Sequence, residues 1–227
     1  LADSSKVWLN SGSKLIFPGQ FKDKIREVYI EGEAFFDIAR NPQRPFHVQT
    51  SDLLIRVLGT RFNVKSYPEE DVVETTLVSG SLQLERDNAS GRTELRLQQH
   101  QKAIYYKGSS KLKLQEDQVT NQKEQGDKSE IATIHATNET QPLNQMAVDT
   151  AWKDNNLIFR KEKLSELSKK LERWYDIRIT IENETLKEYR FSGNIKDETV
   201  EQALEAISMA SEVGYKIDKK EITLYKR

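Results

Sequence analysis

The sequence predicts a mainly β N-terminal domain, sandwich or solenoid-like in form, followed by a small α+β domain. Three observations support this prediction. Short runs of β-branched and aromatic residues recur through residues 1–116, and turn residues separate them. Residues 117–147 are rich in polar side chains and poor in large apolar ones, which predicts a polar linker or long loop. From residue 148 to residue 227, helical and strand periodicities alternate.

The strands expected in the first domain are short. They cover residues 7–9, 14–17, 27–30, 34–38, 46–49, 54–58, 62–64, 72–78, 81–85 and 101–106. Asn, Gly, Pro and Ser residues between the runs are typical of turns. Residues 81–85 alternate between polar and apolar side chains, which predicts one solvated and one buried face. Periodicity alone leaves a sandwich, a barrel and a solenoid open.

The second domain is predicted to have the order β-α-β-β-α-β-β. Its strands are expected at residues 157–159, 177–181, 189–193, 215–217 and 222–224. An apolar stripe at helical spacing predicts the first helix, and it comprises Leu164, Leu167, Leu171 and Trp174. Thr199 and Gln202 form a capping box that predicts the start of the second helix. A further brief strand is expected at residues 131–134, inside the polar linker.

Composition restricts the classes of function. The 227 residues are 36% hydrophobic and 31% charged, which is enough apolar content for a folded core. The net charge of −1 provides no overall basic field for nucleic acid. The absence of cysteine excludes thiol catalysis, thiolate zinc sites and disulfides. No apolar run approaches the ~20 residues that span a bilayer. Because the chain begins at Leu1 without methionine, we expect a fragment or a processed product.

Few side chains suggest catalysis. The three histidines, His47, His100 and His135, lie in separate segments without the short spacing of metal ligands. Glu31 and Glu33 could serve as an acid and base pair in a hydrolase built on a β-scaffold. Gly32 between them instead indicates a bend or bulge at a solvated edge. We therefore predict no enzyme activity and no catalytic, cofactor-binding or metal-binding residues.

The aromatic content leaves a second function class open. Trp8, Trp152 and Trp174 could stack on sugar rings, as in a carbohydrate-binding or adhesive β-module. Trp174 lies on the apolar stripe of the predicted helix, so core packing is the stronger interpretation. Trp152 follows the polar linker and is expected to anchor the second domain. Only Trp8 remains open as a surface aromatic residue.

Three motifs identify a family resemblance. They are Gly32-Glu33-Ala34-Phe35-Phe36-Asp37, Arg44-Pro45-Phe46 and Leu58-Gly59-Thr60-Arg61-Phe62-Asn63-Val64. Together they resemble the periplasmic region of FecR-like anti-sigma factors of the Bacteroidetes type. The resemblance implies a structural role for a set of signature residues: Gly32, Glu33, Phe36, Arg44, Pro45, Phe46, Gly59, Thr60, Phe62, Asn63 and Trp152. Residues 152–159, 171–177 and 191–193 likewise resemble the short N-terminal signalling domain of secretins and TonB-dependent transducers.

The resemblance also implies a function. It implies a periplasmic sensor region of a single-pass inner-membrane protein, which relays a signal from an outer-membrane TonB-dependent transducer to an extracytoplasmic-function sigma factor. The sigma factor would bind a cytoplasmic segment outside this chain, and no cofactor is implied. We expect the transducer to contact an exposed strand edge or a helix face of the second domain. The candidate residues for this contact are Ile177, Arg178, Ile179, Thr180, Ile181, Tyr215, Lys216 and Ile217, and the sequence does not show which edge is free.

Overall fold

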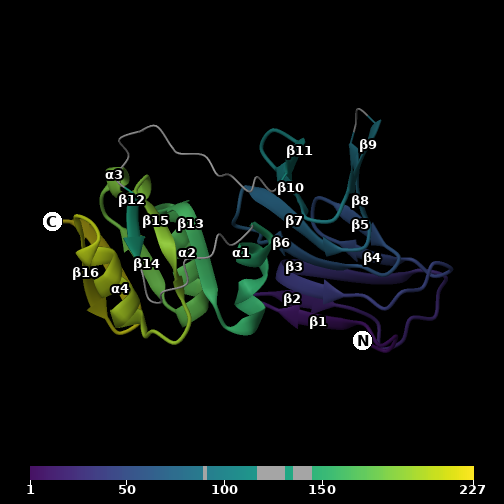
Figure 1. The fold of residues 1–227 in the computed structure, drawn as a ribbon, viewed down its shortest axis with the longest axis horizontal. Coiled ribbons are helices and arrows are strands. Elements are labelled where there is room, and N and C mark those ends of the chain that lie inside the picture. The colour runs from purple at the N-terminus through teal and green to yellow at the C-terminus, as the bar shows by residue number, and fades with distance from the viewer. Residues whose placement is uncertain (89–90, 117–130, 135–144) are drawn as a thin grey trace. The chain divides into compact units, whose positions relative to one another are not determined.

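The computed structural model describes residues 1–88, 91–116, 131–134 and 145–227 (Figure 1). The chain divides into two compact units. The first unit comprises Leu1–Val119 and Leu143–Lys153, and the second comprises Thr120–Pro142 and Asp154–Arg227. Much of the predicted linker, residues 117–130 and 135–144, lies outside the described residues. The sequence predicted that the second domain begins at residue 148, whereas the contacts group residues 143–153 with the first unit.

The first unit is built on one eleven-stranded sheet. Its strands are β1 (Lys6–Leu9), β2 (Lys14–Ile16), β3 (Arg26–Asp37), β4 (Phe46–Gln49), β5 (Leu54–Val57), β6 (Arg61–Ser66), β7 (Val72–Ser79), β8 (Leu82–Asn88), β9 (Gly91–Leu97), β10 (Gln101–Tyr106) and β11 (Lys111–Glu116). The strand order is β11-β10-β7-β6-β3-β4-β5-β8-β9, and β1 and β2 both pair with β3. The helix α1 (Gln145–Thr150) and the 3-10 helix η1 (Ala151–Asp154) follow later in the chain.

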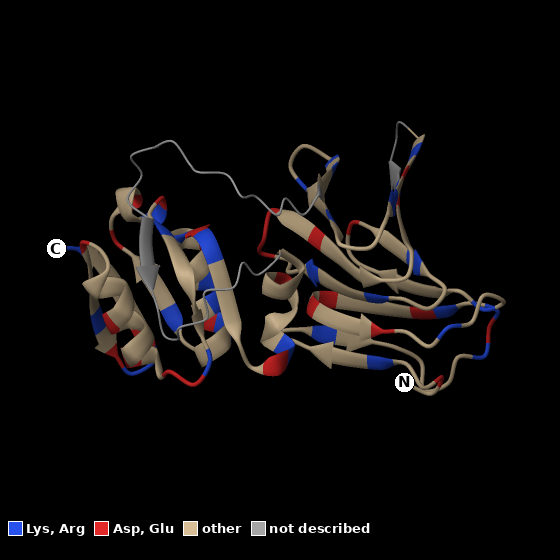
Figure 2. Cartoon of the chain, viewed as in Figure 1, with Lys and Arg blue, Asp and Glu red and all other residues tan. Residues whose placement is uncertain are grey.

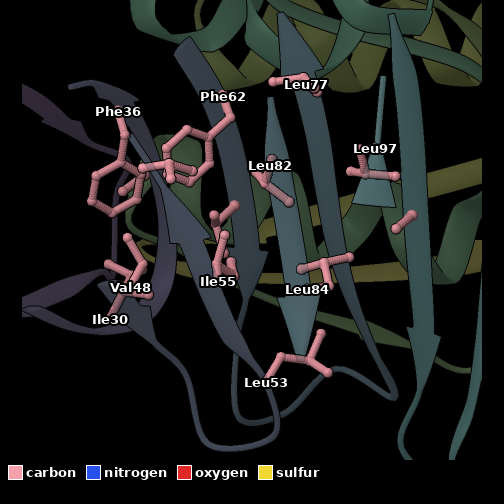
Figure 3. Packing of buried hydrophobic residues seen from close by; sticks show 14 of the residues in the cluster. Ile30, Phe36, Val48, Leu53, Ile55, Phe62, Leu77, Leu82, Leu84 and Leu97 are labelled. Carbon is pink, nitrogen blue, oxygen red and sulfur yellow. The ribbon is translucent and has the colours of Figure 1, made fainter. Parts of the chain in front are cut away.

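The long strand β3 joins the two halves of this sheet. Its N-terminal half pairs with β2 and β4, and its C-terminal half pairs with β1 and β6. Gly32 lies between the halves with φ +97°, a conformation that side chains other than glycine rarely adopt. The sheet curls so that both halves contribute to one apolar core (Figure 3). The mainly β fold class is thereby confirmed, in the form of a single curled sheet.

Alternating side chains along the strands make this core. Val48, Ile55 and Leu84 are opposite one another on three neighbouring strands, and none is accessible to solvent. Phe36 and Phe62 stack across β3 and β6 with ring centroids 5.0 Å apart (Figure 3). Full burial of side chains of this size contributes about 1.5–3 kcal/mol each. The aromatic residues of the signature therefore stabilise the pairing of β3 with β6 and the core of the first unit.

The second unit contains two three-stranded sheets and three helices among the described residues. Its elements are β12 (Ile131–Ile134), β13 (Leu157–Lys163), α2 (Leu164–Tyr175), β14 (Arg178–Ile181), α3 (Glu184–Lys187), β15 (Arg190–Ile195), α4 (Val200–Met209), β16 (Val213–Asp218) and β17 (Glu221–Lys226). One sheet has the order β12-β15-β13 and the other has the order β14-β17-β16. The predicted order of strands and long helices is confirmed, with the one-turn helix α3 added. The expected brief strand is β12, which pairs in parallel with β15.

Local sequence signals account for the helices of this unit. The predicted stripe of α2 places Leu164, Leu167 and Leu171 in the core of the unit. At the start of α4, the Thr199 hydroxyl accepts a hydrogen bond from the backbone N–H of Gln202. The Gln202 side chain in turn accepts one from the backbone N–H of Thr199, which completes the predicted capping box.

Positively and negatively charged residues are interspersed over each unit, in agreement with the near-zero net charge (Figure 2). No helix within the described ranges is long and apolar enough to cross a membrane.

Candidate functional site

A buried polar chain links the signature residues of β3 and β6. Both oxygens of the Glu33 carboxylate accept amide hydrogen bonds, one from Asn10 (2.7 Å) and one from Asn63 (2.8 Å). The side-chain oxygen of Asn63 accepts a bond from the indole N–H of Trp152 (3.3 Å). Glu33 is 8% exposed and Asn63 is 3% exposed. Because buried polar groups are costly without partners, this series of hydrogen bonds holds Trp152 against the sheet.

Trp152 therefore belongs to a different unit from the one expected. The sequence position after the polar linker suggested an anchor for the second domain, but the residue lies in the first unit with Asn63. The physical reason is the hydrogen bond from the Trp152 indole N–H to the Asn63 side-chain oxygen. The order of segments along the sequence does not reveal this contact. Glu31 and Glu33 do not act as a matched pair of carboxylates, because Glu33 is fully engaged by amide donors while Glu31 accepts from the Tyr29 hydroxyl (3.3 Å).

An ion cluster fixes the preceding helix α1 to the same sheet. The ammonium group of Lys102 lies 3.1 Å from carboxylate oxygens of both Glu74 and Asp149. The hydroxyl of Thr76 donates to Asp149 (2.5 Å), and the Gln145 amide donates to the same carboxylate (2.8 Å). Burial lowers the pKa of Lys102, but the two carboxylates outweigh burial and raise it above its ordinary value. Lys102 therefore remains charged, and together with Trp152 it anchors the segment of residues 145–153.

The other signature residues organise the loops of the first unit. Arg26 is 1% exposed and contacts Asp3 (2.7 Å), and its Nε donates to the carbonyl oxygen of Arg44 (2.9 Å). Arg44 itself donates to the carbonyl oxygens of Phe21 and Asp23. The remaining signature positions have packing roles or close approaches. Pro45 accepts from the backbone N–H of Arg26, Phe46 packs under the Arg26 guanidinium, Gly59 approaches Arg40, and Thr60 donates to the Ser81 carbonyl oxygen.

The residues expected to bind a partner lie on the two edges of the sheet β14-β17-β16. Strand β17 is in the centre, so β14 and β16 each have one side without a neighbouring strand. Arg178, Ile179, Thr180 and Ile181 lie on β14, Ile177 precedes it, and Tyr215, Lys216 and Ile217 lie on β16. The two candidate segments therefore belong to the same sheet. The sequence alone did not show which of them forms an exposed edge. Both segments are edges, and neither is an internal strand.

The register shows which backbone groups face outward on β16. Arg227 N–H donates to the Glu212 carbonyl oxygen (2.9 Å), so these opposite residues form a hydrogen-bonded pair. In an antiparallel ladder such pairs alternate with pairs that do not bond to each other. The N–H and C=O groups of Tyr215 and Ile217 therefore point away from β17. No described residue bonds to these groups.

The edge of β14 is partly occupied by the protein itself. Arg178 N–H donates to Lys220 and Glu182 N–H donates to Leu224, so the alternate residues Ile179 and Ile181 face outward. The outward N–H of Ile179 donates to the Glu172 carboxylate of α2 (2.7 Å). This side-chain contact satisfies a group that a partner strand would need. Of the two edges, β16 is the more open.

Comparison with known proteins identifies the family. The family model described as FecR protein matches residues 1–83, and the model described as FecR, C-terminal matches residues 156–224. The chain belongs to the FecR family. FecR-like proteins are membrane-anchored regulators that act on a sigma factor, so this chain belongs to a regulatory system of signal transduction. Among proteins with curated descriptions, no match was found.

Solved structures agree with this assignment. Two crystal structures, at 1.65 Å and 2.50 Å resolution, show a protein from Parabacteroides distasonis ATCC 8503 that is assigned as an anti-sigma factor. Each is 25% identical in sequence to this FecR-like chain, with a TM-score of 0.80, and the match covers 100% of this chain and 92% of the other. The FecR-like assignment is supported in both units, because one family model matches residues 1–83 and the other matches residues 156–224.

Sequence reasoning missed several residues of this FecR-like chain. Lys102 and Asp149 belong to no sequence motif, and only the fold brings them together as an ion pair. Glu172 lies among charged residues of α2, and nothing in the sequence marks it as the partner of an edge strand. His135 lies outside the described residues, and no group of three or more metal-ligating side chains forms among those described.

His47 gives the FecR-like chain a predicted pH dependence. Burial, and then the nearby Arg56 guanidinium, lowers the pKa of His47 below its ordinary 6.5, against the opposing charges of Glu27 and Glu85. The unfolded chain then binds a proton more readily than the folded chain. We expect the free energy of unfolding to fall as the pH drops from about 7 to below about 6. Urea unfolding of the wild type and of His47→Gln at both pH values measures the effect, and equal pH slopes for both proteins would contradict the assignment to His47.

Proposed function

We propose that this FecR-like chain is the periplasmic sensor region of a transmembrane anti-sigma factor. In this proposal, the signalling domain of an outer-membrane TonB-dependent transducer is the partner. The full-length protein is anchored in the inner membrane, and a cytoplasmic segment outside this chain binds the sigma factor. The second unit has the element order expected of a small signalling domain, which supports a role in contact between domains.

The open edge of β16 is the observation that carries the contact. Tyr215 and Ile217 present outward N–H and C=O groups that a partner strand can complete. Their side chains are half-buried against the core of the second unit, which keeps the edge straight and in place. Tyr215 also donates from its hydroxyl to Glu205 of α4 (2.8 Å). The partner is therefore proposed to add a fourth strand beside β16.

Binding should be measured by calorimetry between this chain and the purified signalling domain of the TonB-dependent transducer encoded beside it. Tyr215→Pro removes one outward N–H without removing a bond to β17, so the sheet is expected to remain intact. Its proline ring also blocks the approach of a partner strand. We expect at least about tenfold weaker binding, since a lost hydrogen bond costs about 1 kcal/mol and the steric block adds to it.

Two variants serve as controls. Tyr215→Ala removes the same side chain but keeps the N–H, and it is expected to bind more tightly than Tyr215→Pro. Ile181→Pro removes an outward N–H at the β14 edge and is expected to bind like the wild type. Circular dichroism confirms that each variant is folded. Loss of binding in Ile181→Pro alone would move the contact to β14, and unchanged binding in both proline variants would overturn strand pairing as the mechanism.

A further inference from the structure

The first unit carries a polar row across four neighbouring strands. His47 on β4 is opposite Arg56 on β5, Arg56 is opposite Gln83 on β8, and Gln83 is opposite Arg96 on β9. Opposite residues on paired strands project to the same face of a sheet. The row therefore crosses one face of the sheet at right angles to the strands. With strands about 4.8 Å apart, it is about 14 Å long.

A pocket of about 580 Å³ lies over this row. The lining also includes Pro45, Leu58, Ser81 and Gln98, each two residues from a member of the row and just beyond the end of its strand. Leu58 is 40% exposed, although it is a large apolar side chain. The lining thus has an apolar side at Pro45 and Leu58 and a cationic side at Arg56 and Arg96. The volume is in the range of pockets that hold small ligands.

The charge of the lining is positive and has no counter-charge within it. No aspartate or glutamate is among the lining residues, which include two arginines. Arg56 contacts Glu85 outside the lining (2.9 Å), but Glu85 also pairs with Arg92, so its charge is already compensated. Arg96 makes no hydrogen bond or ion pair with any described residue. An arginine with unused donors at a pocket is suited to bind a carboxylate through two parallel hydrogen bonds.

We propose that this pocket binds the C-terminal residue of a peptide, with its free carboxylate between Arg56 and Arg96 and an aliphatic side chain against Leu58 and Pro45. Arg56 and Leu58 are two residues apart in the chain, a spacing of at most about 6.6 Å, so the cationic and apolar sides are separated by one short residue. A C-terminal leucine or valine places its carboxylate and its side chain within that distance. The lining contains no phenylalanine, tyrosine or tryptophan, the side chains that supply the large flat faces on which sugar rings stack.

This site lies on the first unit and is separate from the edge of β16. Its ligand does not depend on the transducer contact, so failure of one proposal leaves the other standing. The probe for the test is N-acetyl-Ala-Val-Leu with a free carboxylate, titrated into the isotope-labelled chain and followed by NMR. We expect saturable shifts of the backbone amides of His47, Arg56, Gln83 and Arg96.

Two changes test the carboxylate contact. The C-terminal amide of the same peptide and the variant Arg96→Gln are each expected to weaken binding by at least about tenfold, because a charge-assisted hydrogen bond is lost. Arg160→Gln, an exposed arginine outside the lining, is expected to bind like the wild type.

The remaining outcomes would overturn the proposal. Absence of saturable shifts, shifts confined to other residues, or equal affinity for the acid and the amide would each exclude a carboxylate site here. Isovalerate provides a free aliphatic acid of the same chemistry. If isovalerate binds as tightly as the peptide, the pocket takes a small aliphatic acid and the peptide proposal is wrong.

Discussion

Replacing Gly32 with alanine is expected to lower the free energy of unfolding by about 3 kcal/mol, because two costs add. The residue has φ +97°, which is unfavourable for any residue with a Cβ atom. The new Cβ would also lie 2.7 Å from the backbone Cα of Ser13 and 2.5 Å from its Oγ. Ser13 directly precedes β2, and its backbone cannot move aside without loss of the bond from Glu33 N–H to the Ser13 hydroxyl (2.8 Å).

Equilibrium unfolding in urea measures this change. Gly108→Ala is the matched control, because its Cβ would meet no atom within 4 Å and its φ is not in the strained region. We expect the control to change stability by less than about 0.5 kcal/mol. A Gly32→Ala protein as stable as the control would show that β3 does not need the positive φ at its centre.

Replacing Lys102 with methionine is expected to destabilise the FecR-like chain by about 3 kcal/mol, the size of effect seen when one partner of a buried ion pair is removed. Methionine has a similar length but no charge, so Glu74 and Asp149 would lose the cation that they share. Their mutual repulsion and the loss of the Lys102 bond would weaken the attachment of α1 to β7 and β10. Urea unfolding measures the loss, with Lys111→Met at an exposed position as the control.

A second substitution tests the cause. If repulsion between the two carboxylates is responsible, Lys102→Met combined with Asp149→Asn is expected to cost less than the sum of the two single changes. Additive costs would instead assign the loss to packing of the lysine side chain. The same double-mutant cycle therefore separates the electrostatic contribution of the cluster to stability from the packing contribution of the lysine side chain.

Periodicity in the sequence was sufficient for most elements of the fold. The stripe from Leu164 to Leu171 and the capping box at Thr199 are local signals, and both elements formed where they were expected. In the order β14-β17-β16, β16 and β17 form a local hairpin, but β14 is separated from its neighbour β17 in the chain by α3, β15, α4 and β16. Whether Ile179 or Tyr215 faced an open edge therefore could not be read from their own segments.

The candidate sites divide in the same way. Glu33 and Asn63 belong to motifs, so the sequence singled them out, but the bond from Trp152 to Asn63 joins positions 89 residues apart. The row from His47 to Arg96 depends on the register of four strands, and each residue is an ordinary polar position of its own strand. These sites form through tertiary contacts between segments that are distant in the sequence. Composition and residue spacing do not predict such contacts.

The helix α1 and the strand β12 have a consequence for how the protein can be divided. In chain order, β12 belongs to the second unit, α1 belongs to the first, and the residues from Asp154 onward belong to the second again. Neither unit is therefore encoded by one uninterrupted stretch of sequence. A fragment that ends before α1 would lack the carboxylate partner of Lys102, and one that begins at α1 would lack the strand beside β15. A continuous fragment that contains all parts of one unit therefore also contains part of the other.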